Sequence, residues 1–120
     1  MAAHKPNTKI LARLRRICGQ LPEVTEGASF GNPTFRAGKK PFVVLDRYKD
    51  TDCVFIYVEP GRRDALLKAP HFFKAPFDPR GKGICRDLDA IDWAELEGLI
   101  FASYRSVALK RMLAALRRSL

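Results

Sequence analysis

Two neighbouring apolar segments constrain the fold more than any other feature of the sequence. Residues 42–45 and 53–58 are rich in β-branched and aromatic side chains, which favour strands. The polar residues 46–52 between them are expected to form a turn, and this connection is too short for a parallel crossover. The two strands must therefore pair as an antiparallel hairpin, and we expect an antiparallel sheet.

Both ends of the chain show helical periodicity. Asn7 or Thr8 can cap a first helix whose apolar face is formed by Ile10, Leu11, Leu14, Ile17, Cys18 and Leu21. Near the other end, Asp92 is a suitable N-cap for a helix that begins at Trp93, and a last helix continues or restarts near Ser106. We therefore predict one α+β domain over residues 1–120: a two-layer sandwich in which N-terminal and C-terminal helices flank the antiparallel sheet. Residues 1–6 are predicted to be a flexible tail.

The segments between these helices complete the predicted sheet. Residues 23–27 are expected to be a polar connection, and 29–31 and 34–36 to be short strand-like pieces. Gly38 marks a tight turn that places Lys39 and Lys40 at its tip. A short helix is expected over 62–69 and a last strand over 84–88.

The segment from Leu67 to Trp93 combines prolines with aromatic side chains. Proline restricts its own φ angle and disfavours helical conformation in the residue before it, so this segment cannot be one continuous helix. Its phenylalanines carry too much apolar area to be left in water. We expect an ordered loop folded over the core. It forms either the lip of a binding site or a hydrophobic lid with solvated charges.

The positive charge of the sequence is concentrated at its two ends. The net charge is +9. Residues 1–20 carry five basic and no acidic side chains, as do residues 101–120, while the middle of the chain is close to neutral. A basic excess favours encounter with polyanions such as nucleic acids, although solvated surface charge explains the same pattern.

The sequence contains no local motif for several classes of function. Cys18, Cys53 and Cys85 have no paired spacing, so neither a disulfide framework nor a zinc site is predicted, and no cofactor is expected. No phosphate-binding glycine motif or nucleophile elbow is present, so we do not expect an enzyme. The sequence lacks a membrane-spanning run or the apolar centre of a signal peptide, which favours a cytoplasmic protein of bacterial type.

Short motifs along nearly the whole chain resemble the MmcQ/YjbR family of small bacterial proteins. They lie at residues 21–26, 31–40, 66–67, 70–76, 82–83, 92–96 and 103–104. The resemblance implies a frataxin-like (CyaY-like) sandwich described as a double-wing DNA-binding fold, with no established reaction. Frataxins bind iron through an acidic first helix. The first helix predicted here has no Asp or Glu, which argues against an iron-donor role.

Two hypotheses follow for the function. The first is a non-enzymatic DNA-binding protein, a monomer with weak sequence specificity, that contacts phosphates through basic hairpin and loop residues. Its candidate contacts are Arg36, Lys39, Lys40, Lys74, Arg80, Lys82 and Arg86. The alternative is a binder of small or anionic ligands with a pocket between the sheet and the loop 70–83. The candidate lining of that pocket is Phe72, Phe73, Phe77 and Trp93.

Overall fold

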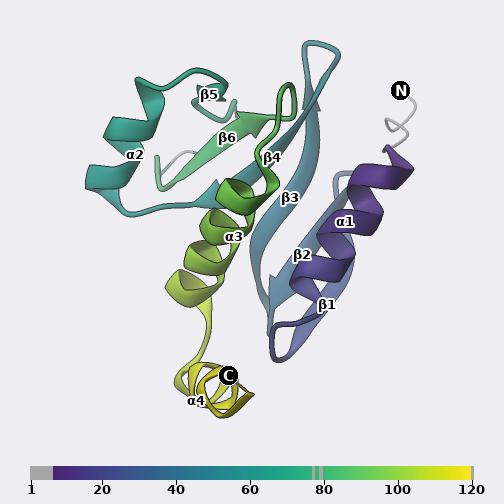
Figure 1. Cartoon of the computed structure of the whole chain (residues 1–120), viewed down its shortest axis with the longest axis vertical. Coiled ribbons are helices and arrows are strands. Elements are labelled where there is room, and N and C mark those ends of the chain that lie inside the picture. Colours follow the sequence, from purple (N-terminus) through teal and green to yellow (C-terminus); the bar gives the residue numbers. More distant parts are fainter. Residues whose placement is uncertain (1–6, 77, 79, 120) are drawn as a thin grey trace.

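A six-stranded antiparallel sheet forms the centre of the protein (Figure 1). The computed structural model describes residues 7–76, 78 and 80–119; the predicted tail 1–6 lies outside this range. The strands follow the spatial order β1-β2-β3-β4-β6-β5. The elements are α1 (Thr8–Cys18), β1 (Val24–Ser29), β2 (Asn32–Ala37), β3 (Lys40–Tyr48), β4 (Thr51–Tyr57), α2 (Pro60–Leu67), β5 (Phe72–Phe73), β6 (Gly83–Asp87), α3 (Trp93–Val107) and α4 (Lys110–Ser119). The predicted α+β class is confirmed.

Helices α1 and α3 share one face of the sheet. In Figure 1, α1 crosses β1 and β2 while α3 crosses β3 and β4. The core between the layers includes Leu14 of α1, Leu99 of α3, and Val54 and Ile56 of β4, all less than 2% exposed. Since side chains alternate along a strand, the residues between these β4 positions point to the opposite face of the sheet.

The predicted starts of α1 and α3 are confirmed. The Asn7 side chain accepts hydrogen bonds from the backbone N–H groups of Lys9 and Ile10 at 3.0 and 3.2 Å, and Asp92 caps α3 in the same way. Such caps satisfy N–H groups that have no partner inside the helix. The starts of α1 and α3 therefore follow from local sequence chemistry.

The first strand was misplaced by the sequence prediction. Residues 24–29 form β1, although 23–27 were expected to be a polar connection. β1 is an edge strand whose residues are mostly exposed, so it lacks the apolar alternation by which strands are recognised. Phe30 and Gly31, expected to be strand-like, instead form the tip of the β1–β2 hairpin with φ angles of 51° and 83°. Phe30 is fully exposed there.

Two further boundaries differ from the prediction. The turn expected over 46–52 is confined to Lys49 and Asp50, which adopt φ angles of 50° and 64°, so β3 and β4 are longer than predicted. Helix α2 begins at Pro60 rather than at residue 62, because proline fits the first helical position, where no N–H group is needed.

Helix α4 packs against the end of the sheet at the β2–β3 turn. Met112 is fully buried, and its methyl group lies where a Cβ atom on Gly38 would be. Gly38 has a φ angle of 62°, so glycine suits both the turn and the close approach of α4. Arg111 forms a bidentate pair with Glu23 at 2.9 and 3.0 Å, which ties α4 to the segment before β1.

Candidate functional site: a cationic groove beside β4

A groove of about 930 Å³ lies at the end of β4, between the described part of the loop before β6 and the C-terminal residues of α3. Phe55 and Tyr57 alternate with the core residues of β4, so their rings face outward into this groove. The two rings meet edge to face with centroids 5.2 Å apart. The full lining is Lys40, Pro41, Phe55, Tyr57, Val58, Pro60, Asp78, Arg80, Gly81, Lys82, Ser106 and Val107.

The aromatic floor depends on a glycine in the neighbouring strand. A Cβ atom on Gly83 would overlap the ring of Phe55, so only glycine leaves room for that ring across β6. Arg63 of α2 donates a 2.8 Å hydrogen bond to the carbonyl of Gly83 and fixes this end of β6. The floor is therefore held by three elements that are distant in sequence.

The loop that borders the groove is held by Asp78. Its carboxylate accepts hydrogen bonds from the backbone N–H groups of Lys82 at 3.3 Å and Gly83 at 2.8 Å. Gly81 turns the chain with a φ angle of 61°. With its backbone held in this way, the loop leaves the side chains of Arg80 and Lys82 free to reach solvent at the groove edge.

Three cations form the rim of the groove: Lys40, Arg80 and Lys82. All three residues are exposed. Asp78 is the one carboxylate among the described lining residues, and it is engaged with the backbone N–H groups of its own loop. The rim thus provides positive charge directly above the aromatic floor, which is the arrangement that an anion with an apolar or aromatic part requires.

The hydroxyl of Tyr57 is a hydrogen-bond donor within this charged environment. Burial and the nearby carboxylate of Asp78 raise its pKa above the ordinary value, while Arg80 acts in the opposite direction. The phenol is consequently protonated at neutral pH, and it can donate to an oxygen of a bound ligand.

Three other predicted cations lie outside the groove. Lys39 is exposed at the β2–β3 turn next to Lys40, and Lys74 is exposed after β5. Arg36 is half-buried on β2, where its guanidinium lies against Gly27 and donates to the Ser29 hydroxyl at 3.3 Å. Of these, Lys39 and Lys74 are exposed, whereas Arg36 is occupied by contacts to β1.

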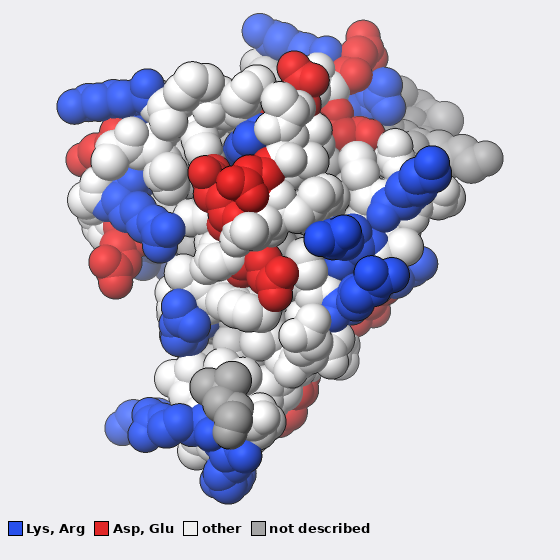
Figure 2. All heavy atoms as spheres, viewed as in Figure 1, with Lys and Arg blue, Asp and Glu red and all other residues white. Residues whose placement is uncertain are grey.

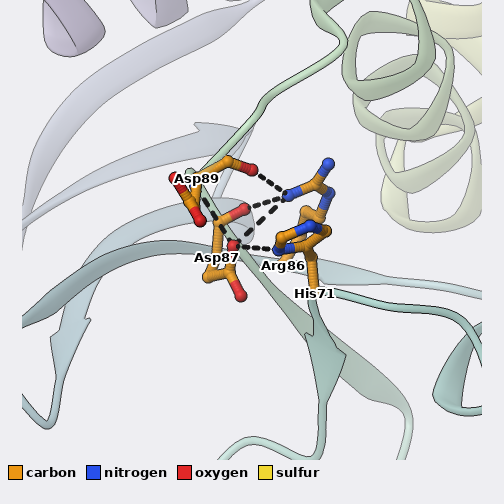
Figure 3. A network of polar contacts seen from close by, with 4 residues as sticks. All are labelled: His71, Arg86, Asp87 and Asp89. Atoms are coloured by element: carbon orange, nitrogen blue, oxygen red, sulfur yellow. Dashed lines mark hydrogen bonds and ion pairs between the residues drawn. The ribbon is translucent and has the colours of Figure 1, made fainter.

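Arg86 is not placed to contact a phosphate. It is 6% exposed, and its guanidinium donates to the carbonyl oxygens of Asp87 and Asp89 and to the Asp87 carboxylate (Figure 3). His71 Nδ1 lies 2.9 Å from the same carboxylate. We call His71, Arg86, Asp87 and Asp89 the polar network. Burial and the pairing of Arg86 with the Asp87 carboxylate remove Arg86 from the candidate nucleic-acid contacts.

The described residues of the predicted aromatic pocket lie in three separate contacts. Phe72 lies under the Arg86 guanidinium, Phe73 stacks on Tyr48, and Trp93 lies under Arg13 of α1. Phe77 lies outside the described residues. Loop 70–83 does border the observed groove, but in its described part it does so through residues 78 and 80–82.

Sequence reasoning missed Phe55 and Tyr57 as site residues. The signal was present in the alternation of residues 53–58, where apolar side chains occupy both faces of a strand. One face packs under the helices, which leaves the aromatic side chains of the other face available to line a groove. The sequence alone does not show which face lines a groove, because a run of apolar residues at every position is equally typical of a strand buried on both faces.

The basic terminal helices are both visible on the helix-covered face (Figure 2). In that view blue side chains gather over α1 at the right and α4 at the bottom, and acidic side chains lie between them over α3. Two of the helix cations are also paired, Arg15 with Glu26 at 2.7 Å and Arg111 with Glu23 at 2.9 Å. The terminal charges therefore do not form one continuous cationic surface in this view.

Neither the cysteines nor the acidic residues indicate a metal centre. Cys18, Cys53 and Cys85 are buried free thiols, and burial raises the pKa of Cys18 to about 12. No cluster of three or more His, Cys, Asp or Glu side chains suited to a metal ion occurs among the described residues. No helix in the described part of the chain is long and apolar enough to cross a membrane.

Comparisons with known proteins agree on one family and one fold. A family model described as YjbR matches residues 19–106. The crystal structure of Deinococcus radiodurans protein DR2400, which carries the family-model domain DUF419, has a TM-score of 0.73 and 21% identity over 89% of this chain and 87% of that chain. A Pseudomonas syringae protein solved by structural genomics has a TM-score of 0.67 and 15% identity over 85% and 98% of the two chains. At these identities the structural likeness concerns the fold alone. No curated protein matches the chain.

Proposed function

The chain belongs to the YjbR family, and from its groove we propose that it is a non-enzymatic DNA-binding protein that grips the phosphate backbone through the rim cations. One observation carries the proposal. Three of the predicted phosphate contacts, Lys40 from β3 and Arg80 and Lys82 from the loop before β6, lie around the same groove although Lys40 is far from the other two in sequence. Charge complementarity to the phosphates supplies the affinity, and sequence specificity is weak.

The test is fluorescence anisotropy with short labelled DNA at a low and a moderate salt concentration. The variant Lys40→Gln/Arg80→Gln/Lys82→Gln removes three cations from the rim without adding negative charge. Removing one cation that pairs with a phosphate lowers the slope of log affinity against log salt by about 1, so the triple variant is expected to lower it by about 3 at most.

The matched control is Lys110→Gln/Arg117→Gln/Arg118→Gln, which removes the same charge from exposed positions of α4. If the rim is the binding surface, the control retains most of the affinity and slope of the wild type. Equal losses in both triple variants would show that net charge alone drives binding. No DNA binding at low salt would contradict the proposal.

A second candidate function is favoured by the shape of the groove. Its volume of about 930 Å³ and its aromatic floor suit a small anionic ligand with an apolar part. Such a ligand would raise the melting temperature of the protein, and the increase would grow with the logarithm of ligand concentration once this exceeds the dissociation constant. A thermal-shift series with mononucleotides and aromatic carboxylates tests this candidate, with the rim triple variant as the control that should lose the response.

A further inference from the structure

The groove combines two features that recognise different parts of a polynucleotide. Its rim presents cations, which attract phosphates of any nucleic acid, whereas its floor presents the rings of Phe55 and Tyr57. Aromatic side chains beneath a cationic groove are the means by which proteins bind single strands, because every base offers a flat face for stacking. The bases of a duplex are already stacked on one another and cannot reach a recessed ring.

We propose that the groove takes an unpaired base of single-stranded nucleic acid, which stacks on the ring of Tyr57 while the rim cations pair with the flanking phosphates. The inference rests on the proposed function and adds a preference for single strands over duplexes. In this inference the Tyr57 ring, supported by Phe55, adds stacking on a base to the electrostatic attraction of the rim.

The contacts around Tyr57 support this assignment. Phe55 packs edge to face on the tyrosine ring and is itself confined above Gly83, so the ring that receives the base is supported from one side. The backbone N–H group of Tyr57 donates to the Ser103 hydroxyl at 2.9 Å, which links this strand to α3. A preorganised ring loses little conformational entropy when a base stacks on it.

The positions of the rim cations suit the phosphates of a nucleic-acid strand. Lys40 approaches from β3, while Arg80 and Lys82 approach from the loop, so the base site lies between cations on two sides. A strand that crosses the groove can place successive phosphates near both. The carboxylate of Asp78 is held by backbone N–H groups, which reduces its repulsion of those phosphates.

The experiment compares deoxythymidine and uridine oligonucleotides of about 12 nucleotides with a duplex of the same length, titrated by anisotropy. The wild type is expected to prefer both single strands, or one of them, over the duplex. Tyr57→Leu removes the ring but keeps an apolar side chain. It is expected to lower single-strand affinity about tenfold and to lower duplex affinity much less. Tyr57→Phe keeps the ring and should retain the preference.

Tyr48→Leu is the matched control, since Tyr48 is a partly exposed tyrosine of β3 that stacks on Phe73 outside the groove. A 2-aminopurine base in the oligonucleotide provides a second readout, because stacking on an aromatic ring quenches its fluorescence. If Tyr57→Leu fails to fold, the inference is tested by the 2-aminopurine fluorescence when the oligonucleotide binds the wild type. Quenching would support the stacking site, and unchanged fluorescence would overturn the inference.

The outcomes separate this inference from the proposed function. Equal affinity for single strands and duplexes, unchanged in Tyr57→Leu, would overturn the stacking site while leaving backbone binding intact. Absence of any nucleic-acid binding would overturn both. If thymidine monophosphate bound as tightly as the oligonucleotide, the groove would be a nucleotide pocket, and the single-strand inference would be wrong.

Discussion

The groove and the polar network contain similar basic side chains but hold them in opposite environments. Lys82 and Arg86 lie close together in the sequence, one before β6 and one within it. The Lys82 side chain is exposed at the rim, while Arg86 is buried and donates to two carbonyl oxygens and a carboxylate. The difference teaches that an exposed cation is available to a ligand, whereas a cation surrounded by internal acceptors stabilises the fold.

The largest effect should come from removing the cation of the polar network. Arg86→Met removes the donor to the carbonyl oxygens of Asp87 and Asp89 and one of the partners of the Asp87 carboxylate, so we expect a loss of about 3 kcal/mol in the free energy of unfolding. Lys82→Gln should change stability by less than about 0.5 kcal/mol, because the lysine side chain is exposed. Urea denaturation of both variants measures the contrast. Equal losses in the free energy of unfolding would contradict the difference proposed between the buried Arg86 and the exposed Lys82.

The next effect tests the floor of the groove. In Gly83→Ala the new Cβ atom meets the Phe55 ring, and the ring must shift, so we expect a loss of about 2 kcal/mol together with weaker single-strand binding. Gly98→Ala is the control, because a Cβ atom there meets no described atom within 4 Å. Alanine in that exposed helical position should stabilise by up to about 1 kcal/mol. Thermal unfolding of both proteins provides the comparison.

The smallest effect concerns the ion pairs of the terminal helices. Hydrogen bonding to Arg111 lowers the pKa of Glu23, and hydrogen bonding to Arg15 lowers the pKa of Glu26. A carboxyl group with a lowered folded-state pKa stabilises the fold above its ordinary pKa, and this contribution is lost as the pH falls through the lowered value. The melting temperature of Glu23→Gln/Glu26→Gln should therefore lie slightly below that of the wild type at pH 7. The gap should close at acidic pH, whereas a constant gap would contradict the ion-pair explanation.

Local chemistry made much of the fold predictable. The caps at Asn7 and Asp92, the hairpin of β3 and β4, and the turn at Gly38 each follow from residues close in sequence. β1 could not be recognised because its pairing with β2, rather than its own apolar pattern, makes it a strand. Strand propensity is weak at such an exposed edge and depends on neighbours that the sequence alone does not place.

The site was harder to predict than the fold. The sequence indicated Lys40, Arg80 and Lys82 as candidates but gave no sign that they share a groove, because they come together only through the pairing of β3, β4 and β6. It also ranked Arg86 equally with them, since burial and acceptor geometry are tertiary properties. The loop was proposed as the lining of a pocket because it contains several phenylalanines. The aromatic residues that line the groove, Phe55 and Tyr57, lie instead in a strand whose sequence does not mark it as a site.

The most direct test of the account is an amide chemical-shift titration of the labelled protein with a thymidine oligonucleotide. The account predicts that the largest shifts appear around the groove, at residues 40, 57, 80–82 and 106–107, and that residues 86–89 of the polar network change little. Shifts concentrated on α1 and α4, with the groove unchanged, would contradict it and would assign binding to the basic terminal helices instead.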